Sequence, residues 1–112
     1  MKRELLYSVE YLEFAEGASN RTKDKLSYAI EMLQNTDVIS TKFVKHLINT
    51  EFYELRISVD KEIRVILFTV DNDNINLSRQ IVFLNGFTKK STKDYQREIE
   101  RAITILQKTI QL

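Results

Sequence analysis

Three residue types that carry special chemistry or backbone behaviour are missing or rare in this 112-residue sequence. It has no cysteine and no proline, and glycine occurs only twice. Without cysteine there is no disulfide framework, no thiol nucleophile and no cysteine-based metal site. The single histidine, His46, leaves a zinc site to rely on carboxylates, which is uncommon for structural zinc. Without proline and with two glycines, a low-complexity linker is excluded.

Long apolar runs are also missing. The first apolar stretch is interrupted by Glu10 and Glu13, and no run approaches the ~18 apolar residues of a membrane span. The N-terminal pattern is not that of a signal peptide. The length fits one domain that buries roughly two-thirds of its unfolded surface. We therefore predict a single domain over residues 1–112 that is cytoplasmic and has no contact with a membrane.

The formal net charge of +1 says little about nucleic acid, but its distribution is uneven. Residues 1–40 carry five basic and seven acidic side chains, whereas residues 71–112 carry seven basic and five acidic ones. This weak asymmetry is compatible with a basic face on one side of the fold.

The N-terminal third predicts a strand followed by a helical hairpin. Residues 3–9 are mostly apolar and fit a first strand. Ser8 is a suitable cap for a helix that ends at Gly17, and Asn20 is a good N-cap for an amphipathic helix over about 21–35. Residues 36–50 lack a clear period and are interpreted as an ordered connection.

The middle of the chain predicts three strands. Apolar and polar residues alternate over 53–59, and residues 63–70 are nearly all apolar, as expected for a central strand covered on both faces. Turn-forming residues at 60–62 and 71–74 separate these strands from each other and from a third one over about 75–87. Short turns predict an antiparallel meander.

The C-terminal segment predicts one long helix. Ser91 or Thr92 caps it, and Asp94 lies in the first turn, where a negative charge suits the helix dipole. An apolar stripe follows at helical spacing, made of Ile99, Ala102, Ile103, Leu106 and Ile110. The order β-α-α-β-β-β-α predicts an α+β domain with helices on one side of a small antiparallel sheet.

Three segments of this pattern resemble the RelE/HigB toxin family. They are residues 52–56 (FYELR), 63–68 (IRVILF) and 83–90 (FLNGFTKK). The phage-derived, HigB-like branch shows a Tyr-Glu-Leu-Arg strand, an Arg-Val-aliphatic-aromatic strand and a Leu-His-Gly-Phe-x-Lys-Lys segment. The motifs cover roughly residues 40–112, and the order of elements covers the whole chain. One departure is Asn85, which stands where the family usually has histidine.

The resemblance implies a RelE-like fold and the toxin of a type II toxin–antitoxin system. It further implies cleavage of mRNA in the ribosomal A site by attack of a ribose 2′-hydroxyl on the adjacent phosphate, without metal or other cofactor. The implied partners are a cognate antitoxin, mRNA together with ribosomal RNA, and DNA only through the antitoxin complex. Such a reaction needs cations at the phosphate, for which arginine is well shaped, and aromatic rings suit an unpaired base. Asn85 leaves the general base unassigned.

The candidate residues follow from this chemistry and from the resemblance. For Arg64 the alternative is an ion pair with Glu54 or Glu62, and for Tyr95 it is packing on the preceding loop. Whether Arg56 shares a face with Arg64 depends on the strand register, which the sequence leaves open. His46 is interpreted as a surface or core-edge residue. The candidates are Arg64, Lys89, Lys90 and Tyr95 for catalysis, and Arg56, Arg79 and Lys93 for binding RNA phosphates.

Two other functions remain open at this point. A ParE-like toxin that inhibits DNA gyrase would share the fold and would need no cationic site on the sheet. A catalytically silent module that only binds its antitoxin and acts as co-repressor is kept open by Asn85.

Overall fold

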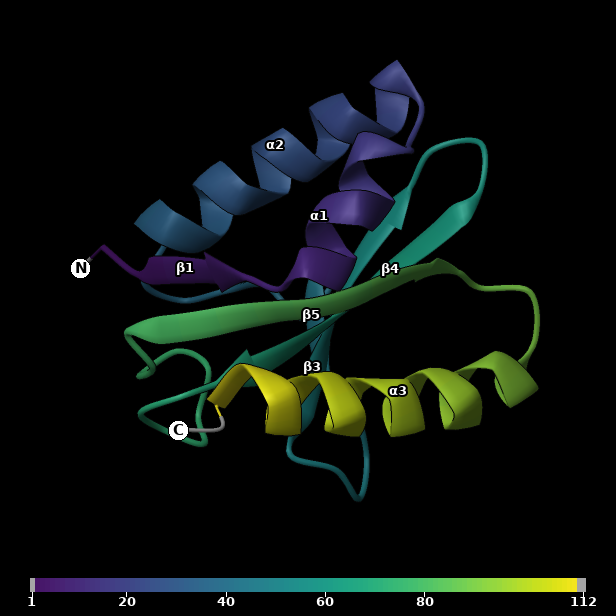
Figure 1. Ribbon diagram of the computed structural model, residues 1–112. Coiled ribbons are helices and arrows are strands. Elements are labelled where there is room, and N and C mark those ends of the chain that lie inside the picture. The colour runs from purple at the N-terminus through teal and green to yellow at the C-terminus, as the bar shows by residue number, and fades with distance from the viewer. Residues whose placement is uncertain (1, 111–112) are drawn as a thin grey trace.

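The computed structural model describes residues 2–110 and shows one mixed sheet with helices on both faces (Figure 1). The strand order is β1-β5-β4-β3-β2. The predicted α+β class is confirmed, and none of the helices in residues 2–110 is long and apolar enough to cross a membrane. The elements are β1 (Glu4–Tyr7), α1 (Val9–Glu16), α2 (Asn20–Asn35), β2 (Val44–His46), β3 (Phe52–Ser58), β4 (Glu62–Thr69), β5 (Gln80–Thr88) and α3 (Thr92–Ile110).

The sheet differs from the predicted antiparallel one in three places. Strand β1 pairs parallel with β5, with Leu5 opposite Ile81, so only β2 to β5 are antiparallel. A short strand, β2, lies within the segment interpreted as a connection, and β5 begins at Gln80 rather than near residue 75. The parallel pairing joins segments distant in sequence, which leaves no local turn signal. Strand β2 has only three residues, too few to show a period, and β5 begins late because the N–H groups of Leu77 and Ser78 donate to the carbonyl of Asn74 in a turn.

The prediction that the helices lie on one side of the sheet is wrong. Helices α1 and α2 cover one face, where Leu33 packs with Leu55 and Phe83. Helix α3 covers the opposite face, where Ala102 packs with Ile66. Strand β4 is apolar on both of its faces because it separates these two cores.

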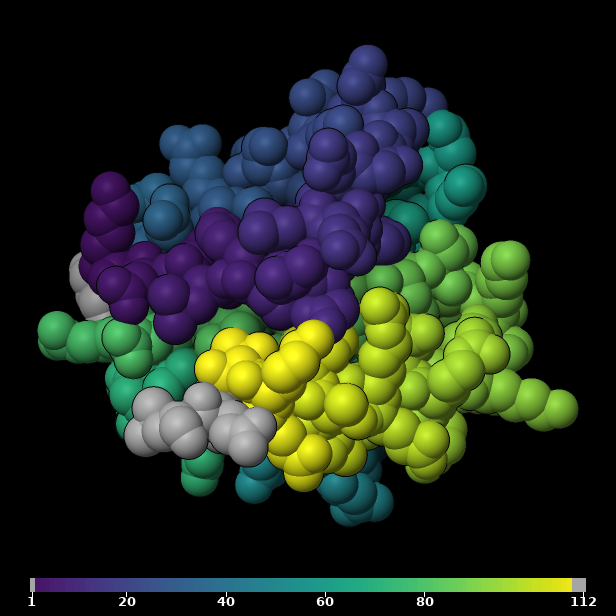
Figure 2. Space-filling model, viewed as in Figure 1, coloured from purple at the N-terminus to yellow at the C-terminus, as the bar shows by residue number. Residues whose placement is uncertain are grey.

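The apolar stripe of α3 is shifted relative to the predicted one. Ile105 is buried against the sheet, whereas Ile103 is 44% exposed. The side chain of Ile110 lies outside the described part of the structure. The C-terminal part of α3 lies against the N-terminal segment on the face shown in Figure 2. Lys108 of α3 forms an ion pair with Glu10 of α1.

A β-bulge between β4 and β5 shapes the centre of the sheet. Val65 pairs with Gly86 and Leu67 with Phe83, so two residues of β5 lie opposite one residue of β4. Gly86 has an ordinary negative φ but no space for a side chain, because an added Cβ would lie 2.4 Å from the Phe14 ring. The glycine is therefore required for close packing of α1 on the sheet.

Near the start of the chain a buried arginine, Arg3, holds together its own segment, the end of α2 and the loop before β5. Its side chain is almost fully buried, and its five N–H groups donate to five backbone carbonyl oxygens. The acceptors lie at the C-terminal end of α2, just after it, and in the loop before β5: Leu33, Thr36, Asp37, Asn76 and Ser78. The strand pattern did not single out this residue.

Candidate active site

The strand register resolves the relation between the two sheet arginines. Arg56 of β3 lies directly opposite Arg64 of β4, so both side chains project from the face that α3 covers. Adjacent like charges on facing strands are destabilising unless they are compensated. The sheet therefore needs an anion beside this pair.

The compensating anion is Glu54, two residues before Arg56 on the same strand face. Its carboxylate is buried and lies 3.2 Å from Nε of Arg56 and 3.9 Å from Nε of Arg64. Within the described residues, Oε2 of Glu54 has no hydrogen-bond partner. A buried carboxylate between two guanidinium groups stabilises the pair and leaves one oxygen for a further donor.

Arg64 is engaged on all sides, and its side chain is only 5% exposed. Its Nε donates to the hydroxyl of Tyr95 at 3.1 Å, and Nη1 donates to the backbone carbonyl of Ile63. Nη2 reaches Glu62 at 3.5 Å. The ion pairs with Glu54 and Glu62, which the sequence offered as the structural role of Arg64, are thus both present. Through its hydrogen bond to Tyr95, Arg64 also holds the start of α3 on the sheet. Arg56, whose side chain is 35% exposed, is the more accessible of the two.

Tyr95 and Lys89 complete this end of the sheet. The Tyr95 ring meets Phe87 edge-on, and Nζ of Lys89 lies 5.6 Å from the ring centre. Burial raises the pKa of Tyr95 above its usual value of 10, and the nearby Glu54 carboxylate adds to this while Arg64 opposes it. The phenol is therefore protonated at neutral pH.

The carboxylate of Glu62 lies at the same end, in an exposed position. A hydrogen bond from Ser58 holds the pKa of Glu62 below its usual range, and the cations of Arg64 and Lys89 lower this pKa further. Its backbone carbonyl accepts from the N–H of Lys89 at 2.8 Å. Glu62 is thus ionised and connects β4 to the residue after β5.

The other sequence candidates lie outside this group. Lys90 and Lys93 are exposed at the start of α3, and the carboxylate of Asp94 accepts from the backbone N–H of Lys90 at 2.8 Å. Arg79 precedes β5, whereas Lys89 follows it, and nine extended residues place them about 30 Å apart. The structure therefore brings Arg56, Arg64, Lys89 and Tyr95 together and places Arg79 at the far end of the sheet.

Asn85, at the position where the resemblance expects histidine, is buried under α3. Its Nδ2 donates to the carboxylate of Glu98 at 2.9 Å and to the carbonyl of Glu98 at 3.2 Å. Through these two hydrogen bonds the Asn85 side chain attaches α3 to the bulged part of β5. His46 is exposed, as interpreted from the sequence, and bonds the carbonyl oxygen of Thr50.

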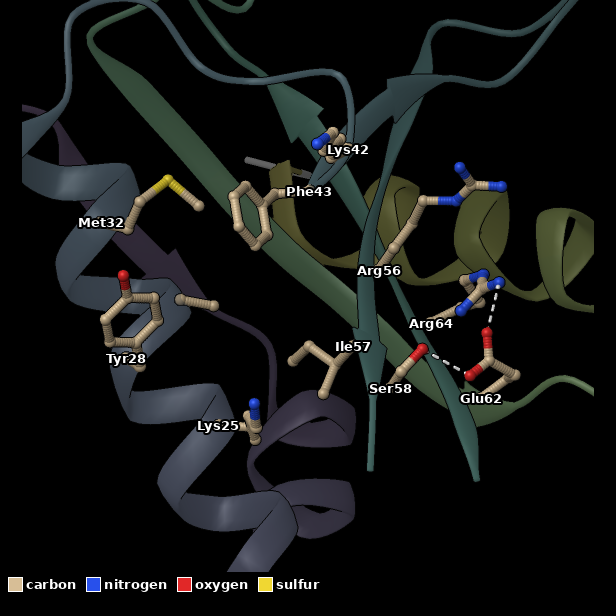
Figure 3. Close-up of a pocket in the computed structure, with 11 residues that line it drawn as sticks. Lys25, Tyr28, Met32, Lys42, Phe43, Arg56, Ile57, Ser58, Glu62 and Arg64 are labelled. Atoms are coloured by element: carbon tan, nitrogen blue, oxygen red, sulfur yellow. Dashed lines mark hydrogen bonds and ion pairs between the residues drawn. The ribbon is translucent and has the colours of Figure 1, made fainter. Parts of the chain in front are cut away.

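An open groove of about 460 Å³ begins beside the arginines (Figure 3). Strand β2 pairs only with residues 53–55 of β3, and the N–H of Arg56 makes a last bond to the carbonyl of Phe43. Beyond that bond the edge of β3 is open. Ile57 points toward α2, while Arg56 and Arg64 lie on the other side of the strand. The groove therefore connects the arginine pair to the side of α2.

Metal-binding side chains are not gathered in the part of the chain described by the structure. Among residues 2–110 no group of three or more histidine, cysteine, aspartate or glutamate side chains is placed to hold a metal ion. The groups that can act on a ligand at this end of the sheet are cations, two carboxylates and a phenol.

Comparison with known families identifies the chain. Residues 13–107 match the family described as Phage derived protein Gp49-like (DUF891). The chain belongs to this family. A search of curated proteins finds no match to the sequence.

Solved structures show that this Gp49-like protein has the RelE fold. It is similar to an arginine-to-alanine double mutant of the E. coli toxin RelE in the free state, with a TM-score of 0.65 and 11% identity. A crystal structure of the isolated E. coli RelE toxin gives a TM-score of 0.56 at 11% identity. Each match covers 90% of this chain and 98% of the RelE chain. The predicted membership of the RelE/HigB-like toxin family is confirmed.

Several residues of the Gp49-like site were not singled out by the sequence. Lys25 and Tyr28 of α2, together with Lys42 and Phe43 before β2, line the groove. They are remote in sequence from the recognised motifs and reach the site only through the packing of α2 against β3. The sequence does hold one sign of an exposed aromatic residue at this site, because Tyr28 lies on the polar face of an otherwise regular amphipathic helix.

Proposed function

We propose that this protein is the toxin of a toxin–antitoxin pair and acts as a ribosome-dependent mRNA endonuclease. The observation that carries the proposal is the cationic cluster, defined as Arg56, Arg64 and Lys89, which meets Tyr95 at one end of the sheet beside an open groove. A gyrase inhibitor that acts by protein contact has no need of such a cluster.

The proposed reaction is an internal transfer of the phosphoryl group. The 2′-oxygen of a ribose forms a bond to the adjacent phosphorus, and the bond from phosphorus to the 5′-oxygen of the next nucleotide breaks. The 2′-hydroxyl loses its proton to a base and the 5′-oxygen receives one from an acid. The products are a 2′,3′-cyclic phosphate and a 5′-hydroxyl. Cations preorganised at the phosphate stabilise the charge that develops during this step.

The accessible residues have distinct roles in this reaction. Arg56 and Lys89 bind the phosphate, since both are cationic and exposed in part. Arg64 positions Tyr95, whose hydroxyl is protonated at neutral pH and supplies the proton to the 5′-oxygen. Glu62 is the ionised group at the groove that is able to accept the 2′-proton. It is a weak base, so most of the rate comes from electrostatic stabilisation.

The proposed partners are those that a toxin of this kind requires. A toxin of this kind is held inactive by a cognate antitoxin and reaches DNA only in complex with it. The mRNA is cleaved in the ribosomal A site, where ribosomal RNA completes the binding surface. The proposed location is the cytoplasm, where ribosomes translate the substrate.

Expression from a tight inducible promoter, with transcript 5′ ends mapped within minutes, tests the proposal. New ends inside translated codons are expected with the natural protein and absent with an Arg56→Ala, Lys89→Ala double variant. An Arg97→Ala, Arg101→Ala variant loses the same charge from the exposed face of α3 and is expected to cleave normally.

The other outcomes separate the remaining functions. Growth arrest without new ends, unchanged in the Arg56→Ala, Lys89→Ala variant, would refute the nuclease and indicate the gyrase-type toxin. Soluble, folded protein that causes neither arrest nor cleavage would indicate the silent antitoxin-binding module.

A further inference from the structure

Two exposed aromatic rings line the groove between α2 and the edge of β3. Tyr28 is 66% exposed and Phe43 is 42% exposed, and neither ring belongs to the two hydrophobic cores. Single exposed aromatic residues are ordinary on protein surfaces. Two rings that line one groove together with cationic side chains are the arrangement by which proteins hold single-stranded nucleic acid.

The charge of the groove is strongly one-sided. Four cations line it against the single carboxylate of Glu62. An adjoining hollow along α2 shares Lys25 and Tyr28, but there Arg21 is balanced by Asp24 and pairs with Asp60, so the excess of positive charge belongs to the groove itself. The cations that line the groove itself are Lys25, Lys42, Arg56 and Arg64.

The elements that present the two rings are well fixed. Lys25 and Tyr28 are three residues apart on α2 and so share a helix face, with the buried Ala29 beneath them. Phe43 belongs to a turn in which its own N–H and that of Val44 both donate to the carbonyl of Ser40. Figure 3 shows Tyr28 and Phe43 on opposite walls, with Met32 beside them. A flat ligand thus meets walls that are already in place.

We propose that this groove is a base-stacking subsite for single-stranded RNA, in which Tyr28 and Phe43 hold a nucleotide next to the scissile phosphate. The inference rests on the proposed function, because that function places the scissile phosphate at Arg56. The rings contact the face of the base, and Lys25 and Lys42 bind the phosphates that flank it. Stacking of this kind tolerates any base, so the subsite contributes affinity and positioning more than sequence readout.

The test measures RNA binding separately from cleavage. A fluorescein-labelled, single-stranded RNA hexanucleotide with 2′-O-methyl riboses lacks the attacking hydroxyl, and fluorescence anisotropy at low ionic strength gives its affinity. Tyr28→Ala and Phe43→Ala are each expected to weaken binding about 5- to 150-fold, the fold-change that the typical energy of base stacking converts to. Tyr28→Phe keeps the ring and is expected to bind like the natural protein.

Two control variants show whether the loss of any exposed apolar side chain weakens RNA binding. Val38→Ala and Ile48→Ala remove apolar side chains that are 74% and 79% exposed outside the groove, and are expected to leave the affinity unchanged. The thermal midpoint of each variant confirms that it folds. Alanine variants of the two rings that bind as tightly as the natural protein would overturn the subsite. So would a natural protein that does not bind the oligonucleotide.

Comparison with the cleavage experiment separates the two proposals. If the protein cleaves mRNA in cells and Tyr28→Ala changes neither RNA affinity nor the cleavage pattern, the subsite is wrong and the nuclease stands. If no transcript is cleaved but RNA binding still requires both rings, the nuclease is wrong and the groove is an RNA site.

Discussion

Replacing Arg3 by methionine is expected to destabilise the fold by about 3 kcal/mol. The change removes all five hydrogen bonds from the guanidinium to backbone carbonyl groups. Two of these bonds, to Leu33 and Ser78, are buried, and each orphaned carbonyl costs about 1–3 kcal/mol. The other three carbonyls are partly buried and recover part of their loss through water. Removing a buried charge offsets some of the cost.

Urea unfolding measures this change directly. With a slope of about 1.5 kcal/mol per molar urea, a loss of 3 kcal/mol lowers the midpoint by about 2 M. Arg3→Lys, with three donors for five acceptors, is expected to lie between the natural protein and Arg3→Met. Arg21→Met is the control, because its ion pair with Asp60 is exposed, and it is expected to change stability by about 0.5 kcal/mol at most. An Arg3→Met midpoint within 0.5 M of the natural one would show that these hydrogen bonds do not stabilise the fold.

Three further predictions test other parts of the structure. Gly86→Ala places a methyl group against the Phe14 ring and is expected to lower the free energy of unfolding by about 1–3 kcal/mol. The loss should be smaller when Phe14 is also replaced by alanine. An equal loss with and without the Phe14 ring would contradict this contact. Asp71 has a pKa lowered to about 2, mainly by the Ser78 hydroxyl, so its stabilising effect is present above pH 4 and lost as pH falls toward 2. Asp71→Ala should therefore lower the thermal midpoint at pH 7 but not at pH 2, and a constant difference would contradict this assignment. Tyr95→Phe should fold with a loss of about 1 kcal/mol and cleave mRNA at least tenfold more slowly. The rate of the natural protein should stay constant from neutral pH to pH 9, because Glu62 is already ionised and Tyr95 is still protonated over this range, and a fall within it would contradict the assignment of Tyr95 as the acid.

The local pattern of the sequence was sufficient to predict the three helices and four of the five strands in residues 2–110, all but β2. The Ser8 cap and the alternation over 53–59 are local signals, and the structure confirms both. For α2 the cap is Ser19 rather than Asn20, since its hydroxyl accepts from the N–H of Thr22. Such one-residue differences arise because neighbouring polar residues compete for the same role.

Features that depend on pairing at long range were not predictable. The parallel pairing of β1 with β5 joins residues about 76 positions apart, and β2 is only three residues long. The bulge at Asn85 shifts the register, so this residue, at the position where the family usually has histidine, turns under α3 to Glu98. A local motif does not encode the shift, because it results from how two strands align.

The candidate site was predicted in part. The resemblance selected Arg64, Lys89 and Tyr95, which the structure places together. It did not reveal the buried Glu54, which holds the two arginines side by side, nor the groove walls contributed by α2. These residues join the site through the packing of elements whose contacts are absent from the linear pattern.

Cleavage of a defined mRNA on purified ribosomes tests whether the protein is a ribosome-dependent nuclease that uses the ribose 2′-hydroxyl. One mRNA carries ribose throughout, and its twin carries a single 2′-deoxyribose at the cleaved position. The account predicts a 2′,3′-cyclic phosphate and a 5′-hydroxyl from the first mRNA, no cleavage of the second, and at least a hundredfold slower cleavage by Arg56→Ala, Lys89→Ala. Cleavage at the deoxyribose, or an equal rate for this variant, would contradict it.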